Sequence, residues 1–326
     1  MSESLSEAPQ AAGSPQVPDG PAAAPPTVAP IGGVRAGLGG GAAAGRTRSD
    51  FIYYGLRNRK LIFGLSLELL LVLFAIVGPM IAKYGPQDFT GAQLQRPNGT
   101  YWLGTNTLGQ DIFSQLANGI RESYLIGALG AVSAAVIGMA LGFTAGWRGG
   151  ILDEILQMIT NIIVMIPSLV LLVVIGSYLT SKSILFEGTF IGLTTWPWVA
   201  RAVRAQTFSL RSREFVEMAK LSGKRPLQII VFDIAPNMAS YLVLVVILLF
   251  GSSMLLAASY DFLGLGPTGI VSLGTMMNQA QNDAALLYHE WWWFIPPGVV
   301  LTLMVVALLV ANLGLDEVFN PKLREQ

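Results

Sequence analysis

The side chains that most often carry out catalysis are nearly absent from this chain of 326 residues, which contains no Cys and a single His. Without Cys there can be no thiolate nucleophile, no Cys-ligated metal and no disulfide. The one imidazole, His289, has no acidic or histidine partner at metal-ligand spacing, so we interpret it as a solvated surface residue. The residue types argue against an enzyme. We expect no catalytic residue, no metal site and no cofactor bound by this chain.

The most informative polar segment is residues 206–236. Between residues 214 and 221, apolar side chains recur at three-residue spacing, which places them on one face of a short helix and the charged residues on another. Gly223 follows as a helix-stopping residue. Such a helix either lies on a lipid surface, which the basic residues nearby would favour, or docks into a groove on a partner protein. The apolar residues are Phe215, Met218 and Leu221.

Charge is scarce along the whole chain. Only 12% of the residues are charged, against roughly 25% in an average soluble domain, and the mean hydropathy is +0.56. A protein of this size with so few charged residues cannot have a surface that is exposed to water throughout. We therefore expect the excess apolar area to face lipid. A charge-free run of roughly 20 residues can cross a bilayer as a helix. Such runs occur at residues 123–147, 155–181, 238–260 and 291–315.

Two further segments are interpreted as spans although they contain charge. Residues 61–82 include one acid, Glu68, and residues 183–204 have Glu187 near one membrane interface and two arginines near the other. Long basic side chains can reach the headgroups, which makes the second segment workable. Because backbone groups in lipid must be satisfied within each segment, the spans should be helices. The predicted fold is an all-α polytopic membrane protein with six transmembrane helices.

The distribution of basic residues predicts the orientation of these spans. Six spans place both termini on one side of the membrane. With the termini in the cytoplasm, 16 of the 20 Lys and Arg residues are cytoplasmic and 4 are outside, as the positive-inside rule favours. Residues 83–120 and 261–290 are then extracytoplasmic loops, and residues 206–236 form the long cytoplasmic loop.

Residues 1–48 differ in composition from the membrane domain expected over residues 49–326. They are rich in Ala, Gly and Pro and contain few large apolar side chains, so we expect a disordered cytoplasmic tail. Residues 40–47, GGAAAGRT, nearly match the phosphate-binding pattern G-x-x-x-x-G-K-[ST]. Arg46 replaces the lysine and no strand pattern precedes the motif. We therefore predict no nucleotide site in this chain.

Short motifs follow one another along the chain in a recognisable order. Glu217-Met218-Ala219, followed by Gly223 and later by Pro236, resembles the EAA loop of the membrane subunits of bacterial ABC importers. From about residue 55 onward the chain resembles the second, or C, permease subunit of the dipeptide and oligopeptide permease family. The further matches are Leu103-Gly104-Thr105, Leu108-Gly109, Asp111, Ala145-Gly146-Trp147, Gly149-Gly150, Asp153, Pro167, Trp198-Val199-Ala200-Arg201, Arg204-Ala205, Ser209-Leu210-Arg211, Phe262-Leu263-Gly264-Leu265-Gly266, Trp291-Trp292 and Pro297-Gly298.

The resemblance implies a type I ABC importer permease architecture, in which this chain forms half of a pathway for the uptake of di- or oligopeptides. It implies a sister permease subunit, two ATP-binding-cassette ATPase subunits, an extracytoplasmic substrate-binding protein and membrane lipid as partners, and no nucleic acid. ATP and Mg would be bound by the ATPase subunits. The location implied is the bacterial plasma membrane, with both termini in the cytoplasm.

The resemblance also implies that the short helix in residues 206–236 is a coupling helix in a cleft of one ATPase subunit. There Phe215 would fill an apolar pocket, and Glu217 would make charge-assisted contacts. Small residues would permit close approach of the two backbones. The predicted ATPase-coupling residues are Arg213, Phe215, Glu217, Ala219 and Gly223.

Other candidate residues have two interpretations each. Pro167 and Pro297 remove helix hydrogen bonds, so each marks a gating kink or a static one. The tryptophans at residue 291 and beyond belong to an interfacial aromatic belt or to a docking surface for the binding protein. Residues 101–121 form part of that docking surface or rest on the membrane as a gate. The docking candidates are Gly104, Gly109, Asp111, Trp291 and Trp292.

Departures from the family pattern leave the substrate open. Met218 stands where the family commonly has a second Ala, and residues 312–322 lack its usual carboxy-terminal pattern. Members of this family carry oligosaccharides or nickel as well as peptides, so either cargo is the alternative. An ion-coupled secondary transporter is a more distant alternative. It would predict intramembrane charge or inverted repeats, whereas the predicted spans show one acid and no obvious repeat.

Overall fold

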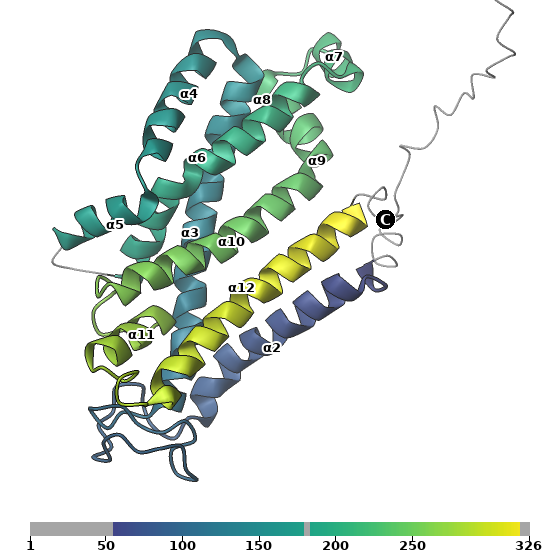
Figure 1. The fold of residues 1–326 in the computed structure, drawn as a ribbon. Coiled ribbons are helices and arrows are strands. Elements are labelled where there is room, and N and C mark those ends of the chain that lie inside the picture. The colour runs from purple at the N-terminus through teal and green to yellow at the C-terminus, as the bar shows by residue number, and fades with distance from the viewer. Residues whose placement is uncertain (1–54, 179–182, 320–326) are drawn as a thin grey trace, which may run out of the picture. The chain divides into compact units, whose positions relative to one another are not determined.

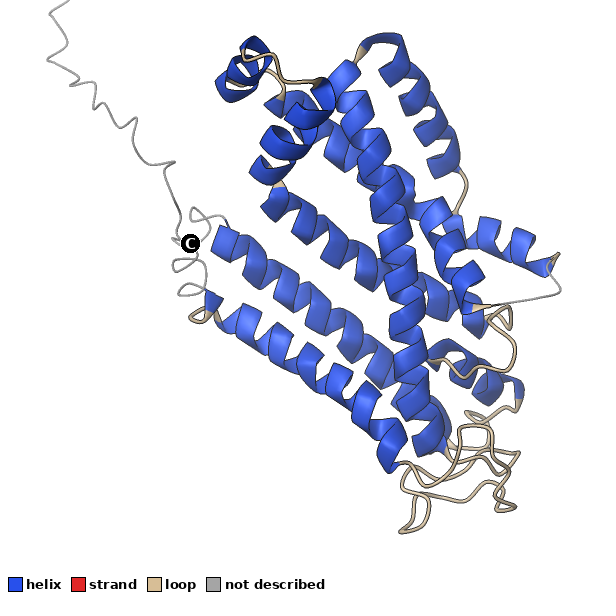
Figure 2. Cartoon of the chain, turned by 180° about the vertical axis from the view of Figure 1, so that it is seen from behind, coloured by secondary structure: helices blue, strands red, loops and turns tan. Residues whose placement is uncertain are grey.

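The computed structural model describes residues 55–178 and 183–319, and the regular secondary structure in these residues is helical (Figure 2). The tail expected over residues 1–48 lies outside the described residues. The helices are α2 (Arg59–Ile81), α3 (Ile112–Arg148), α4 (Gly150–Met165), α5 (Ser168–Ser177), α6 (Ile184–Leu210), α7 (Glu214–Leu221), α8 (Pro226–Ile229), the π-helix η1 (Ile230–Ile234), α9 (Ala235–Asn237), α10 (Ala239–Phe262), α11 (Leu273–Asn282) and α12 (Trp291–Phe319).

Two of the long helices begin at residues whose side chains bond free backbone N–H groups of the first turn. The Asn58 side chain accepts a hydrogen bond from the Leu61 N–H at the start of α2, over 2.9 Å. Asp111 accepts one from the Ser114 N–H at the start of α3, also over 2.9 Å. At the other end of α3, Gly149 has φ of +65°, which ends the helix and turns the chain into α4.

Helix α3 is central among the described helices (Figure 1). It packs along α6, and it also contacts α2, α4, α10, α11 and α12, while α2 packs against α12. Small residues permit the close approach of α3 to α6: a Cβ at Gly138 would lie 2.5 Å from Val199 Cβ, and a Cβ at Gly142 would lie 2.7 Å from the Ala200 carbonyl oxygen. The glycine-rich face of α3 is therefore a packing surface.

The described helices agree with most of the predicted spans. α2, α3, α10 and α12 are each long and apolar enough to cross a membrane, and α4 with α5 makes a fifth candidate if the pair is counted as one span. α6 is not among these candidates: it contains Glu187, Arg201 and Arg204, and Thr, Trp, Gly and Pro fill its middle. Its 27 residues would still extend about 40 Å. The sixth span therefore stays a prediction.

The structure differs from the predicted organisation in three segments. α3 begins at Ile112 and so includes part of the expected outer loop, and α11 lies inside the second expected outer loop. Within the predicted span of residues 155–181, α4 and α5 meet at 75°, so this segment is a broken span or a re-entrant loop. Pro167 lacks an N–H and disfavours helical backbone at Ile166, whose ψ is 121°. The break thus has a local cause.

The buried core lies mainly in two clusters. The first contains Leu273, Trp293 and Met304, from α11 and α12, and the second contains Val203 and Leu249, from α6 and α10. Large apolar side chains on α2 and α12 also remain exposed. Uncharged apolar surface on long helices is what contact with lipid requires.

Candidate functional site: helix α7 and its supports

The short amphipathic helix predicted from the sequence forms as α7. After α7 the chain passes through Gly223 with φ of +74°, and the Lys224 N–H donates to the Ala219 carbonyl over 3.3 Å. This bond across a left-handed glycine is a common way to end a helix. The predictions of the helix and of its stop are confirmed.

Helix α7 has one buried face and one exposed face. Val216 and Ala219 are buried and belong to the same core cluster as Ile229 and Ile234 of the following segment. Ala219 therefore packs within this chain and is not available for the predicted close approach to another protein. Gly223 is open, since a Cβ there would meet no atom within 4 Å.

The exposed face of α7 carries large apolar side chains together with charged ones. Met218 is 67% exposed and Leu221 is 87% exposed, and the Phe215 ring is also exposed. Arg213 is exposed too, and Glu217 lines a cleft of about 290 Å³ with Arg211, Trp147, Ser212 and Lys220. A helix that buries one face in its own chain and leaves large apolar side chains outside has the form of a docking element.

Two cationic side chains hold α7 in place from either side. The Lys224 ammonium lies 2.8 Å from Asp233 Oδ1 on η1. The Lys220 ammonium lies 5.2 Å from the centroid of the Trp147 ring, near the end of α3. These two contacts connect the α7 segment to both α3 and η1.

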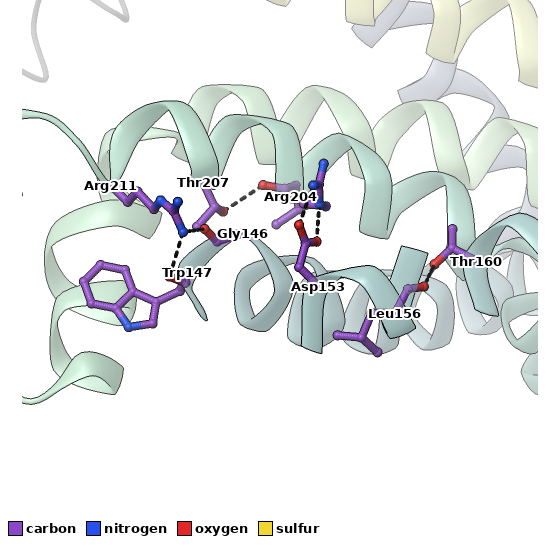
Figure 3. Close-up of polar contacts among 9 residues, drawn as sticks. Gly146, Trp147, Asp153, Leu156, Thr160, Arg204, Thr207 and Arg211 are labelled. Atoms are coloured by element: carbon purple, nitrogen blue, oxygen red, sulfur yellow. Dashed lines mark hydrogen bonds and ion pairs between the residues drawn. The ribbon is translucent and has the colours of Figure 1, made fainter. Parts of the chain in front are cut away.

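Arginines from α6 and its C-cap bind the ends of α3 and α4 (Figure 3). The Arg211 guanidinium donates to the carbonyls of Gly146 and Trp147 over 3.3 and 3.2 Å. These carbonyls lie in the last turn of α3, where oxygens lack helix partners and positive charge is favourable. Arg204 makes a two-pronged ion pair with Asp153 of α4, over 2.5 and 2.6 Å. Together these contacts join α3, α4 and α6 beside α7.

Replacing Arg204 by Leu should destabilise the chain by about 2–3 kcal/mol, because it leaves the largely buried Asp153 carboxylate without its partner. Replacing both residues by Leu should restore most of that loss, since no unpaired charge remains. Thermal unfolding of the purified variants in detergent would measure the stability of the single and of the double variant. A double variant no more stable than the single one would contradict this explanation.

Of the two gating candidates, Pro167 coincides with a structural break and Pro297 does not. Pro297 is buried in α12 without interrupting it. Pro167 lies on the wall of a cavity of about 680 Å³ between α5, α6, α10 and α12. The wall is mainly apolar, with hydroxyl groups from Ser168, Thr194 and Ser252. Val164 lies before the break and Ser168 after it, and both line this cavity, so the break forms part of its wall.

The structure places four of the five docking candidates inside the chain. Gly104, Gly109, Asp111 and Trp292 are all buried, and Trp291 is exposed. A Cβ at Gly104 would lie 2.8 Å from Trp292 Cδ1, so these two residues pack together and shape the segment before α3. The expectation that they face a partner is corrected: without rearrangement, only Trp291 is positioned to do so.

Asp111 has a structural role at the start of α3. Burial raises the pKa of its carboxyl above the usual range, although the hydrogen bond from the Ser114 N–H and the charge of Lys83 oppose this shift. As the N-cap of a helix it satisfies a backbone donor that would otherwise lack a partner. Asp111 therefore holds the entry of the chain into α3.

Sequence reasoning missed one pair of acids. Glu187, expected at a membrane interface, and Asp261, expected in an outer loop, are each no more than 2% exposed and lie against one another. They are 74 positions apart in the chain. Only the packing of α6 beside α10 brings them together, so no local signal could have found the pair.

The family models and the similar proteins point to the same family. Residues 138–325 match the family described as "Binding-protein-dependent transport system inner membrane component", and residues 50–97 match "N-terminal TM domain of oligopeptide transport permease C". The chain is 33% identical to the oligopeptide transport system permease protein OppC of Mycobacterium tuberculosis (strain ATCC 25618 / H37Rv), over 82% of this chain and 92% of that protein. It is 32% identical to OppC of Bacillus subtilis (strain 168), over 82% and 87%. It is 29% identical to the dipeptide transport system permease protein DppC of Haemophilus influenzae, over 85% and 95%.

Proposed function

Since the chain belongs to the family of binding-protein-dependent transport system inner membrane components, the membrane permeases of ABC importers, we propose that it forms half of a translocation pathway beside a sister permease subunit. The cavity at the α4–α5 break supports this proposal. Its wall combines apolar side chains with a few hydroxyl groups, which is the composition typical of sites that bind small molecules.

The proposed coupling element is α7, which would dock in a cleft of one of two ATPase subunits. The observation that carries this assignment is the exposed face of Phe215, Met218 and Leu221 on a helix whose opposite face is buried. Closure of the ATPase pair would move α7, and the contacts of α7 with α3 and η1 would convert that movement into rocking of the long helices.

ATP and Mg would be bound by the partner ATPase subunits, with no nucleotide site in this chain. The weak phosphate-loop match at residues 40–47 supports this proposal, because Arg46 replaces the lysine that would reach the phosphates.

The substrates proposed are di- or oligopeptides, delivered by an extracytoplasmic binding protein. The names of the relatives support this cargo, since they are oligopeptide and dipeptide permeases. Oligosaccharides or nickel remain the alternative cargo for the same type of transporter. The ligand bound to the partner binding protein, identified by mass spectrometry, would decide between them.

We place the chain in a bacterial plasma membrane with both termini in the cytoplasm. The 16 to 4 division of basic residues supports this orientation. α7 lies beside the end of α3, whereas the segment that precedes α3 lies at its other end, so the proposed motor and binding-protein sides are separated by the length of α3 (Figure 1).

Affinity purification of the tagged chain from its own membranes tests the proposed assembly. Two ATPase subunits, a second permease and a binding protein should co-purify, and transport in proteoliposomes should require ATP. A stable homo-oligomer that transports without nucleotide would overturn the proposal in favour of a secondary transporter.

A further inference from the structure

Two arginines of α6 reach across to α4, and they meet different partners there. Arg204 pairs with the carboxylate of Asp153, whereas the Arg201 guanidinium donates to the amide oxygen of Asn161 over 2.8 Å. Among residues 55–178 and 183–319, Arg201 makes no ion pair. A charged side chain without an opposite charge is costly in a membrane domain, and such residues commonly lie where a substrate passes. Arg201 is therefore a candidate for substrate binding.

The Asn161 amide has one possible orientation beside Arg201. A guanidinium group carries only donors, so the atom of Asn161 that faces it must be the oxygen. Asn161 Nδ2 then keeps both hydrogens for another acceptor, and none of the described residues accepts from it. Asn161 is exposed, so a ligand can reach this group. The pair thus presents N–H donors from two side chains together with one positive charge, which suits a carboxylate.

The Arg201–Asn161 pair lies at the edge of the cavity of about 680 Å³. Val164 comes three residues after Asn161 on α4, Trp198 comes three residues before Arg201 on α6, and both line this cavity. Residues three apart in a helix share a face and lie one turn from each other. The pair is therefore one turn beyond the cavity wall on both helices, toward the end of α6 that leads to α7.

The cavity wall offers hydrogen-bond acceptors and no charge. No Lys, Arg, His, Asp or Glu is among the described residues that line it. Three of its hydroxyl groups already donate to carbonyls of their own helices: Thr194 and Thr195 to Ile191, over 2.8 Å each, and Ser252 to Leu249, over 3.0 Å. Each hydroxyl has a single hydrogen, so these three can offer a ligand only their lone pairs. Acceptors thus line the wall, and donors with a positive charge lie at its edge.

We propose that a transported peptide lies in this cavity with its carboxyl terminus at the Arg201–Asn161 pair and its N–H groups toward the hydroxyl oxygens of the wall. This binding mode rests on the proposed function, since it needs a peptide as the cargo. A peptide has N–H donors along its backbone and one carboxylate at its end, which matches acceptors in the wall and donors at the edge. An uncharged oligosaccharide or a nickel ion has no carboxylate for Arg201 to bind.

Trialanine and trialanine amide are the probes for the test, because they differ only at the carboxyl end. Each is added to the purified transporter complex in detergent, without the binding protein, and its binding is measured by equilibrium dialysis. The unmodified complex should bind trialanine more tightly than the amide by roughly tenfold or more. Arg201→Gln should lower the affinity for trialanine to that for the amide, and it should leave the affinity for the amide as it is.

Three further variants sharpen this comparison. Arg201→Lys should keep part of the preference for trialanine, because the charge remains. Asn161→Leu should weaken trialanine binding roughly threefold or more, since one donor is lost. If Arg201→Gln does not assemble, Asn161→Leu decides, because Asn161 is exposed. Arg148→Gln is the matched control: Arg148 is exposed at the end of α3 and bonds to none of the described residues, so both probes should bind as before.

The outcomes separate this binding mode from the proposed function. Equal binding of the two probes to the unmodified complex, or an unchanged preference in Arg201→Gln, overturns the binding mode. ATP-dependent uptake of trialanine in proteoliposomes with the binding protein is measured in parallel, and if it occurs the proposed function still stands. If no uptake occurs, the proposed peptide cargo fails and the binding mode fails with it. Equal binding of the probes, with phosphatidylglycerol stabilising the unmodified complex but not Arg201→Gln, assigns Arg201 to a lipid headgroup instead.

Discussion

Replacing Leu221 by Glu is expected to abolish substrate-stimulated ATP hydrolysis by the assembled transporter while the chain still inserts and folds. The Leu221 side chain is 87% exposed, so its replacement removes little packing within this chain. In a docked complex the new carboxylate would be desolvated without a partner. A cost of about 2 kcal/mol would weaken docking roughly 30-fold. The rate of ATP hydrolysis in proteoliposomes, with and without loaded binding protein, measures the effect.

The matched control for this substitution is Leu287→Glu. Leu287 is 73% exposed and lies after α11, in the part of the chain predicted to be extracytoplasmic. The same change of side chain should leave basal ATP hydrolysis and the unfolding temperature as they are. Normal stimulation in the Leu221 variant, with the protein correctly assembled, would show that α7 is not the docking helix.

Replacing Gly142 by Ala should destabilise the chain by about 2–3 kcal/mol, although it adds only one methyl group. That methyl would lie 2.7 Å from the Ala200 carbonyl oxygen and 2.8 Å from Val203 Cβ, so α3 and α6 must move apart. The separation would also disturb the neighbouring contacts of Arg204 and Arg211. The midpoint temperature of thermal unfolding in detergent should fall, and so should the amount of protein found in the membrane.

Gly251→Ala is the control for this prediction. A Cβ at Gly251 of α10 would lie 3.8 Å from Leu308 and 3.9 Å from Val305, an ordinary packing distance. Since Ala favours a helix over Gly by up to about 1 kcal/mol, this variant should be unchanged or slightly more stable. Equal losses in the two variants would mean that backbone conformation, and not the α3–α6 contact, sets the effect.

Helix α7 shows how much of the structure the local sequence pattern can predict. The three-residue spacing of Phe215, Met218 and Leu221 and the stop at Gly223 are local signals, and both the helix and its end are found where they predict. Which face would be buried was not a local property. Val216 and Ala219 turn inward because η1 and α8 lie there, so the apolar stripe seen in the sequence is the outer face.

The Trp and Gly candidates at the other end of α3 show where the local sequence pattern is not enough to predict exposure. Gly104, Gly109 and Trp292 lie in segments predicted to be outside the membrane, and the family resemblance made a docking surface one of their interpretations. Burial of Trp292 against Gly104 shows that they shape the segment from inside. Solvent access depends on how distant segments fold over one another, which spacing along the chain does not encode.

By itself the sequence determined the membrane class, the helical character and the four candidate spans α2, α3, α10 and α12, because these follow from the amount and run length of apolar residues. It also determined the short amphipathic helix and the glycine that ends it, which depend on neighbours within one or two turns. The break between α4 and α5 follows from Pro167, which is a local feature of the sequence. Tertiary structure decided the two-pronged bond of Arg204 to Asp153 and the contact of Glu187 with Asp261. These features join residues far apart in the chain, or depend on the helices packed around them. Their geometry is therefore set by how α3, α6 and α10 pack.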